Sequence, residues 1–169
     1  MKITTVLWDW NGTLMNDVPL CCELLNHQLT RHGYAPVGGL DAYRRVFRFP
    51  IEQYYQDAGF DFSRHPYSQL AQEYAVLYAS RCESCPLQPN AEAVLRKLQA
   101  QGLHQFILSA SEQKALEQQV AFYGLREYFE ALLGLNNVYA HSKVDVGLTW
   151  LQKSGTPASS VLMVGDSVH

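Results

Sequence analysis

The sequence predicts an α/β fold built around a parallel, doubly wound sheet that is interrupted by an all-helical insertion. A short apolar run near the N-terminus, Ile3 to Trp8, ends at a carboxylate, which is typical of a buried strand that leads into a functional loop. Residues 17–86 carry helical patterns and many aromatic side chains, whereas residues 87–166 alternate between strand and helix patterns. Such alternation indicates a parallel sheet with helices on both faces.

Composition and charge narrow the class of protein. The chain has 169 residues, enough for one domain with an insertion, and 47% of them are hydrophobic, as in ordinary globular proteins. A net charge of −3 argues against a nucleic-acid-binding surface. No apolar run reaches the length of a membrane span, and the N-terminus lacks the long apolar core of a signal peptide. We therefore expect a cytoplasmic protein without a nucleic-acid or membrane partner.

The first strand delivers a carboxylate to a tight turn. The run Ile3–Trp8 is rich in Val, Ile and Thr, and Asn11-Gly12 forces the turn that follows. Asp9 then lies at the carboxyl end of a strand, where open α/β sheets bind their ligands. Backbone N–H groups of the turn, that of Trp10 among them, form a nest for an anion. A carboxylate that faces such a nest predicts attack on a phosphoryl group.

The insertion, residues 17–86, is predicted to be a small helical bundle. Its first helix spans about residues 16–33, with Asp17 as its N-cap, Pro19 in its first turn and Gly33 at its end. Three further helical patterns follow, at Leu40–Phe49, Ile51–Ala58 and Tyr67–Arg81. The many Tyr and Phe residues of this segment are expected to form its core.

The α/β core resumes after the insertion, so it comprises residues 1–16 and 87–169. Asn90 is predicted to cap a helix over Ala91–Gln101, and Ser111 to cap a second one over Glu112–Tyr123. The remaining predicted elements are strands at Leu103–Leu108, Phe129–Leu135 and Val161–Val164, a polar loop at Asn136–Ser142 and a helix at Val144–Lys153. Together they predict a Rossmann-like, doubly wound core.

Four polar residues follow strands of this core or lie in adjoining loops, so we expect them at one edge of the sheet. Asp9 has the chemistry to attack phosphorus and form an aspartyl-phosphate. Ser109 and neighbouring N–H groups, such as that of Ala110, are suited to hold phosphoryl oxygens, and Lys143 to neutralise their charge. Asp9 and Asp166 together form a hard oxygen site suited to Mg²⁺.

The motif Asp9-Trp10-Asn11-Gly12-Thr13-Leu14, the order of the later motifs and the place of the insertion resemble the haloacid dehalogenase-like (HAD) hydrolases, and most closely their phosphoglycolate-phosphatase-like members. The resemblance implies a helical cap that covers the active site and selects a small phosphorylated metabolite. It also implies a function: Mg²⁺-dependent hydrolysis of a phosphate ester. The implied roles are Asp9 as nucleophile and metal ligand, Asn11 as a metal ligand through its backbone carbonyl, Ser109 and Lys143 as phosphate ligands, and Asp166 as a metal ligand.

Asn11 departs from the family pattern. Phosphatases of this family usually carry a second Asp there, which protonates the leaving alcohol and then activates water. Asn has no proton to exchange near pH 7, and general acid–base help is worth about 10²–10⁴-fold. Two alternatives therefore stay open beside the phosphatase: a non-catalytic or regulatory phosphate-binding relative, and a phosphotransferase that uses an acceptor other than water.

Two further departures concern the C-terminal part. The chain stops at His169, whereas relatives continue to another acidic residue, a fifth strand and a last helix, so we expect a truncated core with the Asp166 strand at the sheet edge. Val144 also follows Lys143, where many relatives have proline.

Two clusters outside the motifs carry weaker hypotheses. Cys82 and Cys85 have the C-x-x-C spacing of metal sites, and a zinc site with Cys21 and Cys22 is an alternative to four reduced thiols. Three arginines lie close together on one predicted cap helix, where they either bind a second anionic group of the substrate or form a solvated helix face. They are Arg44, Arg45 and Arg48.

Overall fold

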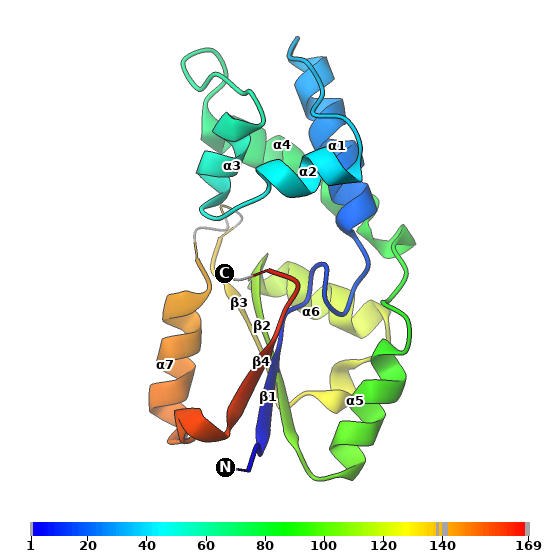
Figure 1. Ribbon diagram of the computed structural model, residues 1–169, viewed down its shortest axis with the longest axis vertical. Helices are drawn as coiled ribbons and strands as arrows, with labels where there is room; N and C mark the ends of the chain where they lie inside the picture. Colours follow the sequence, from blue (N-terminus) through cyan, green and yellow to red (C-terminus); the bar gives the residue numbers. More distant parts are fainter. Residues whose placement is uncertain (1, 138, 140–141, 168–169) are drawn as a thin grey trace.

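A four-stranded parallel sheet lies at the centre of the protein, as predicted (Figure 1). The computed structural model describes residues 2–137, 139 and 142–167. The strands are β1 (Thr5–Trp8), β2 (His104–Glu112), β3 (Ala131–Leu135) and β4 (Val161–Val164), and their order across the sheet is β3-β2-β1-β4. The predicted fold class, an α/β core of the Rossmann-like type, is confirmed.

The strand β1 occupies an inner position because all four of its side chains are buried. It pairs with β2 on one side, where Thr5 is in register with His104, and with β4 on the other, where Thr5 is in register with Val161. A strand that is apolar on both faces suits this position. Asp9 therefore emerges at the middle of the carboxyl edge of the sheet.

Helices cover both faces of the sheet (Figure 1). The helices α5 (Ala91–Ala100) and α6 (Gln113–Phe122) lie on one face, and Leu95 of α5 and Leu116 of α6 are fully buried in the core between them and the strands. The helix α7 (Val144–Ser154) lies on the other face. Short 3-10 turns occur at Cys82–Ser84, Arg126–Tyr128 and Ala158–Ser160.

The insertion forms a helical layer over the carboxyl edge of the sheet (Figure 1). Its helices are α1 (Val18–Arg31), α2 (Leu40–Val46), α3 (Ile51–Asp57) and α4 (Tyr67–Ala79). These helices enclose a core cluster of their own, in which the aromatic residues predicted for this role are prominent. Its buried aromatic members are Tyr43, Tyr54, Tyr55 and Phe60.

The chain crosses between the two layers twice, and the crossings are hydrogen-bonded to each other. The Asn16 N–H donates to the Pro86 carbonyl at 2.9 Å, and the Gln88 N–H donates to the Leu14 carbonyl at 2.8 Å. These bonds lie beside the predicted domain boundaries at 16/17 and 86/87, which stay a prediction.

Of the three predicted helix caps, Asp17 and Asn90 occupy the N-cap position without a side-chain bond, and the Ser111 cap is wrong. Asp17 precedes α1 but makes no capping bond with its side chain, and Asn90 precedes α5 with a left-handed φ of 64° and no side-chain cap. Ser111 lies inside β2, which continues to Glu112, and the Glu112 carboxylate accepts the capping bond from the Ala115 N–H at 2.9 Å. For Asp17 and Ser111 the reason is that other partners, described below, take their side chains.

Several other expectations concern the periphery. β4 lies at the sheet edge, as expected, and its Leu162 and Met163 side chains are exposed. Residues 138, 140 and 141 of the predicted polar loop and residues 168 and 169 at the C-terminus lie outside the described residues. The four cysteines are free thiols, and no three potential metal ligands gather within the described residues, which speaks against the zinc alternative. None of the described helices is long and apolar enough to cross a membrane.

Candidate active site

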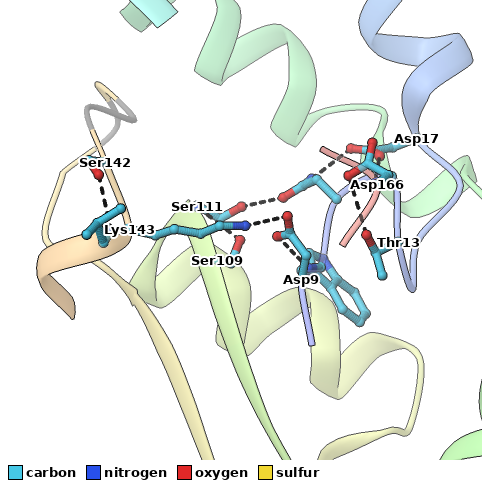
Figure 2. A network of polar contacts seen from close by, with 12 residues as sticks. Asp9, Thr13, Asp17, Ser109, Ser111, Ser142, Lys143 and Asp166 are labelled. Atoms are coloured by element: carbon cyan, nitrogen blue, oxygen red, sulfur yellow. Dashed lines mark hydrogen bonds and ion pairs between the residues drawn. The ribbon is translucent and has the colours of Figure 1, made fainter. Parts of the chain in front are cut away.

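Asp9 is held from both sides at the end of β1 (Figure 2). Its own N–H donates to the Val164 carbonyl at 2.8 Å, which ties it to the end of β4. Its carboxylate oxygen Oδ1 accepts from the Trp10 N–H at 2.9 Å, and Oδ2 pairs with the Lys143 ammonium group. The Asp9 and Lys143 side chains are 10% and 4% exposed, so this is a nearly buried ion pair.

Lys143 reaches Asp9 from the start of α7. The Val144 N–H donates to the Ser142 hydroxyl at 3.1 Å and so fixes the first turn of the helix. A proline at position 144 has no N–H to make this bond. The departure from the family pattern therefore has a local function here, and it does not displace Lys143 from the site.

Asp166 lies next to the turn that follows Asp9. Its Oδ1 accepts from the Thr13 hydroxyl at 3.4 Å (Figure 2). Gly12 has a φ of +73°, and a Cβ there would lie 2.4 Å from Asp166 Oδ2, so only glycine allows this approach. Partial burial of the Asp166 carboxyl group and the negative charge of Asp9 raise its pKa. The carboxylates of Asp9 and Asp166 repel each other, and a divalent cation bound by both would relieve this repulsion.

The Asn11 side chain is the centre of a polar network that joins four parts of the chain. Its amide nitrogen Nδ2 donates to Asp17 Oδ2 at 2.7 Å and to the Tyr78 hydroxyl of α4 at 2.8 Å. Its oxygen Oδ1 accepts from the Ser111 hydroxyl at 2.7 Å. An aspartate at position 11 would place a second carboxylate against Asp17, so the network depends on an amide at this position.

The Asp17 carboxylate accepts further hydrogen bonds in this network. It is 1% exposed, and its Oδ1 accepts from the Gly12 N–H at 2.8 Å. Tyr78 donates to Asp17 Oδ2 at 2.7 Å, and both burial and the charge of Asp17 raise the pKa of Tyr78, so the phenol keeps its proton. With the Asn11 amide and the Cys21 thiol, which lies 3.6 Å from Oδ2, four donors surround this buried carboxylate.

The end of β2 provides Ser109 and Ala110. The pairing of β2 with β3 is irregular between Leu108 and Glu112, and such an irregularity re-aims side chains at functional edges. Ser109 is 1% exposed, and its hydroxyl accepts from the Ser111 N–H at 3.1 Å. The predicted strand end at Leu108 thus falls at this irregularity, although the strand itself continues.

One cavity of about 620 Å³ brings the predicted residues together. Of the residues predicted for the site, it is lined by Asp9, Asn11, Ser109, Ala110, Lys143 and Asp166. Trp10 is different, because its indole is fully buried and donates to Gln119 Oε1 at 2.7 Å, while its backbone N–H is bonded to Asp9. The predicted role of the Trp10 N–H in phosphate binding therefore stays a prediction.

Asp17 and Tyr78 are members of the site that were not predicted from the sequence. Both line the same cavity. Asp17 follows Asn11 by six residues in one loop, which was the available signal, but its position before a helix favoured a cap. Tyr78 lies 67 residues after Asn11, and no sequence pattern links the two.

Comparison with known proteins agrees with this geometry. The model of the haloacid dehalogenase-like hydrolase family matches residues 6–169, which is nearly the whole chain. The chain belongs to this family. The family predicted from the motifs is therefore confirmed, and the protein is a HAD-like hydrolase.

Individual relatives of this HAD-like hydrolase are distant in sequence and close in fold. It is 22% identical over 173 residues to PpaX, a predicted pyrophosphatase of Caldanaerobacter subterraneus subsp. tengcongensis, with 100% of this chain and 76% of the relative covered. A predicted HAD-like hydrolase from Bacteroides fragilis superposes with a TM-score of 0.83 at 22% identity, covering 98% of this chain and 80% of that one. A predicted phosphoglycolate phosphatase from Haemophilus somnus superposes with a TM-score of 0.78 at 18% identity, covering 98% and 78%.

Proposed function

We propose that the protein is a Mg²⁺-dependent phosphatase that hydrolyses a small phosphate ester through an aspartyl-phosphate on Asp9. The observation that supports this most is the Asp9 carboxylate, which lines the cavity and pairs with the nearly buried Lys143. Such a carboxylate beside a cation suits the capture of a phosphoryl group. A cytoplasmic location and a small phosphorylated metabolite as substrate belong to this proposal.

In this proposal, Asp9 forms the new bond to phosphorus. The Trp10 N–H holds Oδ1, so Oδ2 is the oxygen that attacks, and the bond between phosphorus and the alcohol oxygen breaks. Lys143 exchanges its contact with Asp9 for one with the phosphoryl oxygens as charge spreads over them. The Ser109 hydroxyl and the Ala110 N–H hold the other phosphoryl oxygens. Water then hydrolyses the aspartyl-phosphate and releases phosphate.

The residues present fit Mg²⁺. Asp9 and Asp166 are the proposed carboxylate ligands, with the backbone carbonyl of Asn11 as a third, and the raised pKa of Asp166 marks a place where a cation relieves repulsion. When bound, Mg²⁺ neutralises charge on the phosphoryl group and eases its approach to an anionic nucleophile.

The leaving alcohol receives its proton from water in this proposal, because the Asn11 amide cannot donate one. Esters of poor leaving groups are then hydrolysed slowly, and acyl phosphates suffer least. The engagement of Asn11 with Asp17, Tyr78 and Ser111 also favours one alternative, a regulatory relative that binds phosphate without turnover.

Phosphate release separates these functions. Acetyl phosphate and ethyl phosphate are incubated with the protein in Mg²⁺ or in EDTA, beside Asp9→Asn as the control. The phosphatase requires release that depends on both Mg²⁺ and Asp9. Saturable phosphate binding without release above the control would overturn the phosphatase in favour of the regulatory relative, and release that falls when an alcohol acceptor is added would favour the phosphotransferase.

A further inference from the structure

The cavity does not end at the phosphate site but continues under the helical layer. Beyond Asp9 and Lys143, its wall includes many aromatic side chains from α2, α3, α4 and the segment between α2 and α3. These elements lie above the sheet edge in Figure 1. These aromatic residues include Tyr43, Phe47, Phe49, Tyr54, Tyr67 and Tyr74. A volume of about 620 Å³ lies within the range of about 300–1,000 Å³ that encloses drug-sized ligands. A two-carbon phosphate ester needs much less room.

The rings of the aromatic wall contact one another and carry no charge. Phe47 stacks on Tyr43 with ring centroids 5.7 Å apart and contacts Tyr54 edge-on at 5.3 Å. Burial raises the pKa of the Tyr43, Tyr54 and Tyr74 phenols, so these groups stay protonated and uncharged. The half-buried rings of the wall, Phe47, Phe49, Tyr67 and Tyr74, are supported by this packing and offer stacked and edge-on contacts to another aromatic ring.

The wall has little positive charge to offer a second anionic group. Among the described residues that line the cavity beyond the phosphate site, only Arg44 is a cation. Its side chain is 63% exposed and lies 3.7 Å from Asp41. Arg48 pairs instead with Asp57 at 2.8 Å, and neither Arg48 nor Arg45 lines the cavity. The hypothesis that the three arginines form a second anion site is therefore wrong for two of them.

We propose that the alcohol part of the substrate carries an uncharged aromatic ring, which the aromatic wall of the cap binds while Asp9 and Lys143 face the phosphate. The proposal rests on the proposed phosphatase function and narrows its substrate class to aryl-alkyl or nucleoside-type phosphate monoesters. It sets this chain apart from enzymes that take small phosphorylated carboxylates, because a carboxylate placed against the aromatic wall loses its hydration without gaining a buried cation.

Binding of phosphonates tests the proposal without relying on turnover. The probes are 2-phenylethylphosphonate, ethylphosphonate and 3-phosphonopropionate, which share a two-carbon phosphonate chain and carry a phenyl ring, a hydrogen atom or a carboxylate at its end. Titration calorimetry in Mg²⁺ buffer gives each Kd. Burial of the ring predicts that 2-phenylethylphosphonate binds at least about 10-fold more tightly than ethylphosphonate. We expect 3-phosphonopropionate to bind no more tightly than ethylphosphonate.

A pair of matched variants locates the preference in the cap. Phe47→Ala removes a half-buried ring that lines the cavity, and Phe62→Ala removes a half-buried cap ring outside it. The phenyl preference should fall to about threefold or less in Phe47→Ala and persist in Phe62→Ala. Phe47→Leu, which keeps apolar bulk and loses the ring, serves if Phe47→Ala does not fold.

Equal affinities for the phenyl and ethyl probes, or tightest binding of 3-phosphonopropionate, would overturn the proposal. Loss of the preference in Phe62→Ala as much as in Phe47→Ala would do the same. Acetyl phosphate turnover is followed separately on the same preparations. Turnover without a phenyl preference rejects the substrate class and keeps the phosphatase, whereas a phenyl preference without turnover rejects the phosphatase and keeps the ring site.

Discussion

Asp9 and Asn11 are two positions of the same turn, and their side chains meet opposite environments. The Asp9 carboxylate pairs with the ammonium group of Lys143, whereas the Asn11 amide donates to the carboxylate of Asp17. Position 9 thus matches an anion with a cation, and position 11 places a neutral donor against an anion. Asn11 is therefore more than a missing acid, because its amide makes a contact that a carboxylate cannot make.

The largest effect should come from a substitution that removes the ion pair between Asp9 and Lys143. Asp9→Asn removes the proposed nucleophile, and we expect phosphate release to fall by on the order of 10⁴-fold or more. It also leaves the Lys143 ammonium buried without an anion, at a cost of about 3–5 kcal/mol in the free energy of unfolding. Denaturant titration beside the turnover assay measures both.

The double variant Asp9→Asn/Lys143→Met is the matched control for this prediction. It removes both charges, so part of the lost stability should return while turnover stays absent. Turnover near that of the original protein in Asp9→Asn would contradict the assignment of Asp9.

The second prediction concerns the hydrogen bond from the Asn11 amide to Asp17. Asn11→Asp gives position 11 the usual acid but sets two carboxylates against each other where Nδ2 and Asp17 Oδ2 now lie 2.7 Å apart. We expect a loss of about 2–3 kcal/mol in the free energy of unfolding at pH 8 and a smaller loss at pH 5, where one carboxyl group takes a proton. Turnover should not gain the full 10²–10⁴-fold or so that an acid normally adds.

Exchanging the amide and the carboxylate of these two positions tests this prediction further. In Asn11→Asp/Asp17→Asn the donor and the carboxylate trade places, so stability should recover and turnover should exceed that of Asn11→Asp. A large gain of turnover in Asn11→Asp alone, with unchanged stability, would show that Asp17 does not oppose an acid at position 11.

A smaller effect is expected from the cap side of the same network. Tyr78→Phe removes the hydroxyl that donates to Asp17 and accepts from Asn11, and should lower the free energy of unfolding by about 1–2 kcal/mol. Tyr74→Phe is the matched control, because its ring stacks on that of Tyr78 on the same helix, with centroids 5.9 Å apart. Equal losses in the two variants would argue against a specific role of the Tyr78 hydroxyl.

The smallest effect concerns pH. The pKa of Asp166 is raised in the folded protein by burial and by Asp9, so its ionised form opposes folding above that pKa, and the penalty disappears as the pH falls below its ordinary value. Without Mg²⁺, Asp166→Asn should therefore be slightly more stable than the original protein at pH 7. The Asp166 carboxyl group is only partly buried, so solvent screening keeps the gain below about 1 kcal/mol.

Unfolding between pH 4 and pH 8 in EDTA checks this. The gain should shrink toward acid pH, and Mg²⁺ should reverse it at pH 7 by stabilising only the protein that retains Asp166. A gain that grows as the pH falls would mean that the carboxylate favours folding.

Much of the site could be predicted because strand ends are local features of a sequence. Asp9, Ser109 and Asp166 each follow an apolar run, and the geometry of a parallel sheet then brings them to one edge. The order of strands and helices was predictable for the same reason, although β2 continues past its predicted end at Leu108.

The Asn11 network could not be predicted in this way. Asp17 and Ser111 both occupy positions that suit helix caps, but the folded chain offers them partners that local patterns do not contain. Tyr78 reaches Asp17 only because α4 packs over the sheet edge, and that contact arises from tertiary packing between residues 61 positions apart. Long-range polar contacts of this kind have no periodic signature in a sequence.

The paired crossings between the layers have a consequence for how the gene can vary. Backbone hydrogen bonds join Asn16 to Pro86 and Leu14 to Gln88, so the two ends of the cap segment are held together where they leave the sheet. The cap is therefore one long insertion with fixed ends. Doubling the length of a flexible excursion adds only about 0.6 kcal/mol of closure entropy. Changes of length inside the cap therefore cost the sheet little closure entropy, whereas a replaced cap loses the hydroxyl with which Tyr78 reaches Asp17 and Asn11.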